Sequence, residues 1–340
     1  MNPREDKILM SHGNGGRMMH DLIGHLFLKH FGNKILEEQT DAAILPVDTP
    51  EVAFTTDSFV IDPLFFPGGN IGKLAVCGTV NDLAVSGAEP RYISVSFILE
   101  EGFSMQELEV IVKSLAEEAR HAKVTIVTGD TKVVNRGKCD KLFINTAGIG
   151  MVRKKDQMVG KARNIHPGDV IIINGTIGDH GMAVMNARES FNFKSPVISD
   201  CASLNHMIRE ILDRSSGVKF MRDPTRGGVA TVLNELAAKI GHGIEITEQA
   251  LPISKGVSAM CEILGFDTLH IANEGKVIVV ASEQESKLIL EIMRNHPLGK
   301  QSAVIAHIVS DHPGRVVLKT GTGGKRIIDS LTGDPLPRIC

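Results

Sequence analysis

The sequence predicts an α/β protein (α+β) made of two mixed-sheet domains. Its 340 residues suffice for roughly two compact domains, and strand-like and helical segments alternate along the chain. A content of 42% hydrophobic and 23% charged residues is ordinary for a globular protein. The expected parts are a glycine loop with a helix over 1–35, a first domain over 36–152, a second domain over 153–319 and a flexible tail over 320–340.

A glycine run precedes a helix at the N-terminus. The segment HGNGG (12–16) is too rich in glycine for regular structure, and apolar residues recur at helical spacing over 17–31. Successive backbone N–H groups before a helix can bind an anion, although such a run is also typical of a plain turn. The candidate phosphate-binding residues are His12, Gly13, Asn14, Gly15 and Gly16.

The first domain is expected to alternate strands and helices. Ser104 is a plausible N-cap of the second helix, with Glu107 completing a capping box. The expected strands are 52–60, 91–99, 123–130 and 141–150, and the expected helices are 71–88 and 104–122.

A basic connector over 151–169 leads to the second domain. Its expected strands are 169–175, 218–223, 243–247, 276–282, 302–310 and 315–320, and its expected helices are 183–188, 204–212, 228–240, 255–264 and 283–295. The end of the chain has no sustained period, and Pro335 and Pro337 exclude a helix there. It is therefore predicted to be a mobile tail.

Composition argues against several classes of protein. A net charge of −3 gives no basic excess for nucleic acid. The first ten residues lack the apolar core of a signal peptide, and Asn81 and Asp82 interrupt the longest apolar run. Five cysteines form no CxxC pair and no zinc spacing, so we expect free thiols. These observations predict a cytoplasmic protein that binds neither nucleic acid nor membrane.

Several acids follow apolar runs at expected element ends. Asp57, Asp82 and Asp130 share this context, and Asp41 is a weaker fourth member. Mg²⁺ prefers a few carboxylates together with phosphate oxygens and water. A single aspartate in such a place more often forms a turn or cap, but their common placement favours a magnesium site.

Two charged residues are candidates for chemistry. Lys132 lies two residues after Asp130 and can stabilise transferred charge, and Glu274, in NEGK between apolar runs, can act as a general base. Each taken singly is more often a surface charge. Asp223 and Thr225, in RDPTRGG, indicate an anion- or metal-binding turn that opens a helix, or a plain N-cap.

GDHG, with Asp179 and His180, resembles that turn more weakly. No GxxxxGK[ST] frame is present, so any nucleotide site is not a P-loop.

The last residue, Cys340, differs from the other four cysteines, which lie among apolar or small residues. It ends a segment stiffened by proline, where the thiol could travel tens of Å because each residue spans about 3.3 Å. An accidental exposed thiol is the simpler interpretation. The more specific interpretation is that the tail carries Cys340, a soft nucleophile, to a nucleotide site.

Taken together, HGNGG, TTDSF, TVNDLAVSGAEP, TGDTKVV, INGTIGDHG, MRDPTRGG, ANEGK and the ending PRIC closely resemble the HypE family of hydrogenase maturation factors. That family belongs to the superfamily of aminoimidazole ribonucleotide synthetase. The resemblance runs from the N-terminal loop to the last residue. Asn14 departs from it, because the family more often has serine there, which is also a small hydrogen-bonding residue.

The resemblance implies domains of the aminoimidazole ribonucleotide synthetase type and a homodimer that binds ATP where the N-terminal domains join, which makes 36–152 the ATP-binding and dimerisation domain. It implies that Cys340 receives a carbamoyl group from the carbamoyltransferase HypF. ATP then phosphorylates the carboxamide oxygen, a base removes the nitrogen proton, and phosphate leaves to give a thiocyanate. The cyano group passes to the HypC–HypD complex for the iron of a nickel–iron hydrogenase.

The resemblance also assigns residue roles. Asp57, Asp82 and Asp130 hold Mg²⁺ and phosphates, Lys132 and Glu274 serve the dehydration, and Cys340 carries the substrate.

Two alternatives remain. A related enzyme could phosphorylate a free small molecule, as thiamine monophosphate kinase or selenophosphate synthetase does, although the latter needs a reactive cysteine near the N-terminus and none precedes Cys77. A scaffold without enzymatic activity, whose tail docks a partner, is the other.

Overall fold

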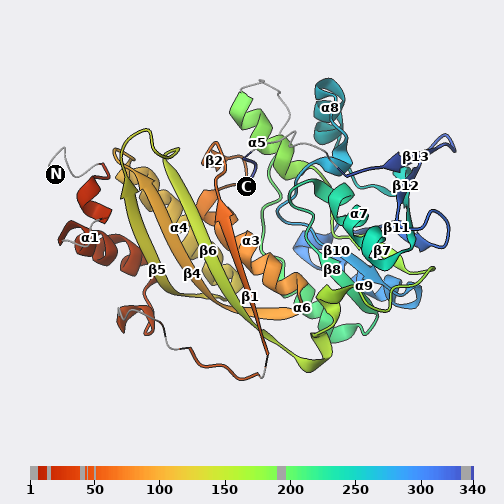
Figure 1. Ribbon diagram of the computed structural model, residues 1–340, viewed down its shortest axis with the longest axis horizontal. Helices are drawn as coiled ribbons and strands as arrows, with labels where there is room; N and C mark the ends of the chain where they lie inside the picture. Colours follow the sequence, from red (N-terminus) through yellow and green to blue (C-terminus); the bar gives the residue numbers. More distant parts are fainter. Residues whose placement is uncertain are drawn as a thin grey trace.

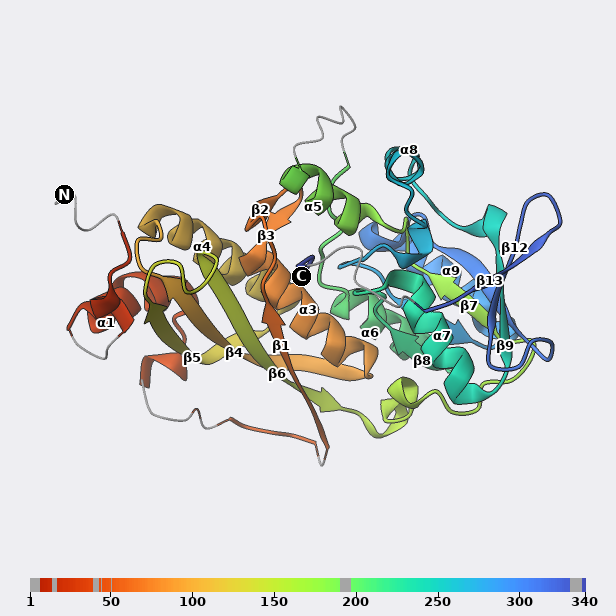
Figure 2. The ribbon, with the colours of Figure 1, turned by 45° about the horizontal axis from the view of Figure 1, so that its top comes forward.

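The computed structural model describes residues 7–13, 17–38, 43, 45–49, 51–189, 197–330 and 338–340. Two domains lie side by side along the long axis of the molecule (Figure 1). The C-terminus lies between them, close to β2 (Phe65–Phe66) and α5 (Asp179–Glu189) in both Figure 1 and Figure 2. Both domains combine mixed sheets with helices, which confirms the predicted fold class.

The N-terminal domain has a sheet with the strand order β1–β6–β4–β5. The strands β4 and β5 run parallel, and the other neighbours run antiparallel. Each strand overlaps an expected one, because β-branched and aromatic residues alternate with small or polar residues. The strands are β1 (Val52–Phe59), β4 (Ala88–Glu100), β5 (Thr125–Val134) and β6 (Leu142–Val152), and a short ribbon pairs β2 with β3 (Gly69–Asn70).

Two helices, α3 (Ile71–Val85) and α4 (Met105–Ala122), cover one face of this sheet. Most side chains of α3 are buried, because it lies between the sheet, α4 and a helix of the second domain. The hydroxyl oxygen of Ser104 accepts a hydrogen bond from the backbone N–H of Glu107, so the predicted N-cap is confirmed.

No helix within the described residues covers the opposite face of the sheet. Phe54 on β1 is 67% exposed there, and Ile98 on β4 is 41% exposed. Directly paired residues point to the same face of a sheet. Lys132 pairs with Ile98, so Lys132 and Asp130, two residues before it, lie on this uncovered face.

The N-terminal segment is helical over 17–31, as the sequence predicts, and packs beside α4. Short helices flank it. The elements are η1 (Met10–Gly13), α1 (Arg17–Leu22), the π-helical turn η2 (Ile23–Leu28), α2 (Lys29–Phe31) and η3 (Leu36–Glu38).

The second domain is a three-layer structure around a mixed sheet. Within the described residues the strand order is β13–β12–β9–β11–β7–β10–β8, and β9 and β12 run parallel. The strands are β7 (Val170–Ile173), β8 (Val218–Arg222), β9 (Gly243–Thr247), β10 (Ile278–Ala281), β11 (Ala303–Val309), β12 (Val316–Lys319) and β13 (Lys325–Ile328).

Helices lie on both faces of this sheet. Helix α7 (Gly228–Ile240) packs on the face that carries Ile171 and Ile173, and α6 (Asn205–Arg214) and α9 (Glu283–Asn295) pack on the other face. This layering explains why every residue of β7 is apolar. The remaining helices are α8 (Lys255–Leu264), η4 (Lys154–Asp156), η5 (Val159–Lys161), η6 (Glu248–Ala250), η7 (Thr268–His270) and η8 (Pro297–Gly299).

The expected flexible tail over 320–340 contains regular structure near its start. Residues 325–328 form β13, which pairs antiparallel with β12. The strand was hard to recognise because it is an edge strand with exposed charges at Lys325 and Arg326. Residues 331–337 lie outside the described residues, but residues 338–340 are described and pack between the two domains.

Candidate active site

The last residues of the chain are hydrogen-bonded to the residues that directly follow β1. The backbone N–H of Val60 donates a hydrogen bond to the carbonyl oxygen of Cys340 (3.1 Å), and that of Asp62 donates to the carbonyl oxygen of Arg338 (3.3 Å). The two bonds are spaced two residues apart on each segment, as in an antiparallel pair, although Arg338 has a positive φ of 54°. Ile339 is 3% exposed and packs into the core, and Cys340 is half-buried beside it. The C-terminal cysteine therefore rests at the domain junction.

Helix α5 holds this terminal segment from the second domain. His180 Nε2 lies 2.8 Å from the carbonyl oxygen of Ile339. Near the other end of the helix, the Arg188 guanidinium donates to the carbonyl oxygens of Arg338 and Asp62, both at 2.8 Å. Both domains thus contact the terminal segment.

The side chain of Arg338 adds two further contacts with the N-terminal domain. Its Nε donates to the carbonyl oxygen of Val60 (3.0 Å), and its Nη1 lies 2.6 Å from the Asp140 carboxylate. The protein therefore contacts each of the last three residues in a different way: Arg338 through its charge, Ile339 through burial of its side chain and Cys340 through its backbone carbonyl.

Three predicted site carboxylates gather at the same junction: Asp57 on β1, Asp82 on α3 and Asp223 after β8. Burial raises the pKa of each, and the pKa of Asp223 rises to about 7, partly through the charges of Asp82 and Asp57. Arg226 lies close enough to lower the pKa of Asp57 and Asp82 in part. An added cation stabilises the ionised form of carboxylates whose pKa is raised in this way.

The carboxylates fit a magnesium ion that has other ligands as well. Among the described residues, no group of three or more His, Cys, Asp or Glu side chains is arranged to hold a metal ion alone. Mg²⁺ usually keeps several waters and takes one or two carboxylates plus phosphate oxygens. Asp57 and Asp82 can supply such a pair.

Within one chain, Asp130 and Lys132 lie away from the carboxylates at the domain junction. Thr55 donates a hydrogen bond to Asp82 on α3 (2.8 Å), so Asp57, two residues along β1, faces the helices. Asp130 instead lies on the uncovered face, where Lys132 Nζ bonds its carboxylate at 2.7 Å and lowers its pKa. Strand β5 is also three strand spacings, roughly 14 Å, from β1. One chain does not bring the three predicted metal ligands together.

The described part of the glycine loop lies against β5. The backbone N–H of Leu9 donates to His12 Nδ1 (2.9 Å), and His12 is buried. A Cβ on Gly13 would lie 2.5 Å from the backbone nitrogen of Val133, so only glycine fits there. The other candidates of this loop, Asn14, Gly15 and Gly16, and the weaker metal candidate Asp41 lie outside the described residues.

The segment RDPTRGG opens helix α7, as the sequence predicts. The backbone N–H of Gly228 donates to the carbonyl oxygen of Thr225 (3.0 Å), which closes the turn after Asp223. Gly227 has a positive φ of 73°, and a Cβ on Gly228 would lie 2.5 Å from the carbonyl oxygen of Leu269. The glycines let the helix begin next to the Asp223 carboxylate.

Glu274 is buried at the junction, 3% exposed. Burial raises its pKa well above the ordinary value, and Cys201 and Asp223 add to this shift. Within the described part of the chain, its Oε1 atom has no hydrogen-bond partner. The Asn81 side chain, from α3, donates to the carbonyl oxygen of Glu274 at 3.2 Å. An unsatisfied buried carboxyl is costly and indicates a functional position.

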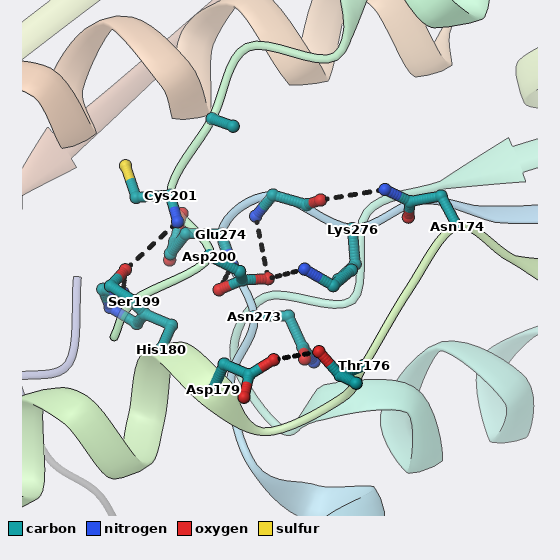
Figure 3. Close-up of polar contacts among 12 residues, drawn as sticks. Asn174, Thr176, Asp179, His180, Ser199, Asp200, Cys201, Asn273, Glu274 and Lys276 are labelled. Carbon is teal, nitrogen blue, oxygen red and sulfur yellow. Dashed lines mark hydrogen bonds and ion pairs between the residues drawn. The ribbon is translucent and has the colours of Figure 1, made fainter. Parts of the chain in front are cut away.

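A buried ion pair fixes the loop that carries Glu274 (Figure 3). The Asp200 carboxylate accepts from Lys276 Nζ (2.8 Å) and from the backbone N–H groups of Glu274 and Gly275 (3.2 Å each). Burial acts to raise the pKa of Asp200, but the Lys276 charge lowers it overall. Asn174 donates to the carbonyl oxygen of Gly275 at 3.1 Å. These hydrogen bonds hold the backbone of the loop in a single conformation.

Sequence reasoning missed several of these residues. Asp200 follows no recognisable motif, and Lys276 could be found only because it lies two residues after Glu274. Arg188 carries no motif either. Asn81 could have been found, because it is a polar residue next to Asp82 within an otherwise apolar helix.

Comparisons with known proteins match this architecture. Residues 39–152 match the N-terminal domain, and residues 166–319 the C-terminal domain, of AIR synthase related protein. The carbamoyl dehydratase HypE of Escherichia coli K12 is 48% identical over 98% of this chain and 100% of its own length. The chain belongs to the HypE family. The predicted resemblance is confirmed over the whole chain, and a HypE enzyme is a carbamoyl dehydratase of hydrogenase maturation, as this protein is.

Solved HypE structures are equally similar. The hydrogenase maturation protein HypE in complex with ATP has a TM-score of 0.94 and 46% identity, covering 98% of this chain and 99% of the other. A HypE–HypF complex has a TM-score of 0.80 and 47% identity, covering 91% and 99%. Membership of the HypE family excludes the alternatives of a small-molecule kinase and a non-enzymatic scaffold. No helix in the described residues is long and apolar enough to span a membrane.

Proposed function

We propose that this protein dehydrates a carbamoyl group carried on the sulfur of its own Cys340. The carboxamide oxygen attacks the γ-phosphorus of ATP and ADP leaves. The nitrogen then loses its protons, the C–O bond breaks, and phosphate departs to leave a protein thiocyanate. Phosphorylation is needed because an amide oxygen is otherwise a poor leaving group. The supporting observation is the hydrogen bond from Val60 N–H to Cys340, which holds the carrier residue at the end of the strand that bears Asp57.

Asp57 and Asp82 would hold Mg²⁺, and Asp223 and Thr225 would border the phosphates. The raised pKa values of the three carboxylates support this assignment, because a divalent cation relieves their repulsion. When bound, Mg²⁺ neutralises charge on the phosphates during transfer.

Glu274 would take a proton from the carboxamide nitrogen. A carboxylate whose pKa is raised by burial is a stronger base than an ordinary glutamate. The free Oε1 atom leaves one acceptor for the substrate.

The uncovered sheet face supports a homodimer. Exposed Phe54 and Ile98 would be shielded by a second copy packed on this face. Such packing would bring the Asp130–Lys132 pair to the interface, where Lys132 could act on the phosphates bound with the other chain. The start of the glycine loop, at His12 and Gly13, lies against β5 at Val133, the residue after Lys132, and would also contribute to ATP binding.

Partners follow from the need to load and unload Cys340. The related HypE–HypF complex supports HypF as the carbamoyl donor. The HypC–HypD complex would accept the cyano group. Both exchanges require the terminal segment to leave the domain junction. ATP and a reduced thiol are both available in the cytoplasm, where we place the reaction.

Phosphate release tests the coupling of ATP to the carrier. Protein carbamoylated by HypF should release one phosphate per carbamoyl group when Mg–ATP is added, and Cys340→Ser should release none. Equal phosphate release from both proteins would refute the proposal.

A further inference from the structure

His180 forms a fully buried link between the second domain and the chain end. It lies at the start of α5, and its Nε2 meets the Ile339 carbonyl oxygen at 2.8 Å across 159 residues of sequence. Its other ring nitrogen, Nδ1, lies 2.8 Å from the Ser199 hydroxyl. The contact with Ile339 is to the backbone next to Cys340, the residue that carries the substrate.

The surroundings fix the tautomer of this ring. Burial lowers the pKa of His180, so the imidazole is neutral. A carbonyl oxygen only accepts hydrogen bonds, so Nε2 carries the proton and Nδ1 accepts from Ser199. The Ser199 oxygen in turn accepts from the backbone N–H of Cys201 (3.1 Å), which directs its hydroxyl hydrogen toward His180. Phe66 packs edge-on against the ring at 5.4 Å.

We propose that His180 is a positioning residue that latches the terminal segment at the domain junction and thereby places Cys340 for dehydration. The latch has two opposite consequences. Dehydration needs the docked segment, whereas loading of the thiol by a partner enzyme needs it undocked. A weaker latch therefore slows the first step and speeds the second. This inference rests on the proposed carrier role of Cys340 only for these two steps, not for docking itself.

Docking is tested first without ATP or partner. The reaction of Cys340 with iodoacetamide is followed on the terminal peptide by mass spectrometry, in a Cys139→Ser background because Cys139 is also partly exposed. His180→Phe keeps the ring volume but removes the donor, and we expect alkylation to accelerate about three- to tenfold, the worth of one hydrogen bond. Unchanged alkylation would overturn the latch, whatever the carrier role of Cys340.

Two variants separate the latch from general packing. His180→Gln can place an amide N–H near the position of Nε2, and it should restore slow alkylation. His180→Asn keeps a polar group near Ser199 but is too short to reach Ile339, and it should react as fast as His180→Phe. If Asn protects the thiol as well as Gln does, the bond to Ile339 is not what matters and the proposal fails. His180→Asn also serves as the variant that has no donor within reach of Ile339, should His180→Phe not fold.

His206 provides a matched control. Its Nε2 also contacts a backbone carbonyl, that of His121 at 2.9 Å, but on an exposed surface between α4 and α6. His206→Phe should leave alkylation unchanged, and acceleration there would indicate a non-specific effect and contradict the latch.

The two catalytic steps form the second arm. In His180→Phe, the rate constant for dehydration at saturating Mg–ATP should fall about three- to tenfold. The affinity for ATP should be unchanged, and carbamoylation should be as fast as in wild type or faster. A loss of ATP binding, or equal slowing of both steps, would overturn the positioning role. If alkylation changes but no adduct forms on wild-type Cys340, the proposed function fails while docking by His180 stands.

Discussion

The backbone N–H of Val60 donates a hydrogen bond to the carbonyl oxygen of Cys340 at 3.1 Å, which joins the residue directly after β1 of the first domain to the end of the chain. Asp57 lies three residues earlier on the same segment. A single extended stretch thus carries a proposed Mg²⁺ ligand and a docking edge for the substrate carrier. Shortening the distance between nucleotide and carrier in this way replaces an encounter in solution by a fixed geometry.

Removal of the Asp82 carboxylate should weaken magnesium-dependent ATP binding. Asp82→Asn keeps the hydrogen bond from Thr55 possible but removes the charge. Calorimetry with Mg–ATP should show at least about tenfold weaker binding, since charge-assisted contacts contribute about 1.5–3 kcal/mol. Asp57→Asn should behave alike. Unchanged affinity with an unaltered circular dichroism spectrum would exclude the magnesium assignment.

The raised pKa of Asp223 predicts that the stability of the ligand-free protein depends on pH. Its pKa is raised from 3.8 to about 7 in the folded state, so the folded protein retains a proton that the unfolded chain loses. The resulting destabilisation is absent below pH 4, grows as the pH rises, and is complete above pH 7. Asp223→Asn should therefore raise the Tm by a few degrees at pH 8 and far less at pH 5. An equal change at both values would contradict the raised pKa.

The buried pair Asp200–Lys276 should be essential for stability. Asp200→Ala leaves the Lys276 ammonium, 9% exposed, without its carboxylate, which typically costs about 3 kcal/mol or more. Chemical denaturation measures this loss. The exposed pair Lys29–Glu109 is the control, and Lys29→Ala should cost about 0.5 kcal/mol or less. Similar losses for the two variants would refute a structural role for the buried network.

Lys132 and Glu274 should affect chemistry more than binding. Removal of a contact made mainly in the transition state lowers turnover but not ground-state affinity. Lys132→Ala and Glu274→Gln should bind ATP within about twofold of wild type and accept the carbamoyl group, yet dehydrate it at least about a hundredfold more slowly. Loss of ATP binding in either variant would assign that residue to nucleotide recognition instead.

Sequence patterns predicted most elements because periodicity reports which faces are buried. Helix α7 was delimited at both ends, Gly228 and Ile240, since a glycine turn opens it and Gly241 closes it. Strand β13 was missed because an edge strand has few apolar residues. Local sequence patterns therefore identify the helices and strands whose burial and ends are marked within the segment itself.

The site was harder to predict because it depends on pairing across long distances. The shared context of Asp57 and Asp130 suggested a common metal site, but strand register sends them to opposite faces of the sheet. Their joint role remains a prediction that requires a second copy of the chain. GDHG contributes to the family resemblance and to a weak turn motif, but nothing local to His180 reveals its contact with Ile339.

Intact-protein mass spectrometry tests the central claim, that Cys340 is the substrate carrier, most directly. With HypF and its carbamoyl donor, the wild-type chain should gain one carbamoyl group, and Mg–ATP should then remove the mass of one water. Both species should map to the terminal peptide, and deletion of Cys340 alone should abolish both while ATP binding persists. An adduct that survives this deletion, or that maps to Cys77, Cys139, Cys201 or Cys261, would contradict the account.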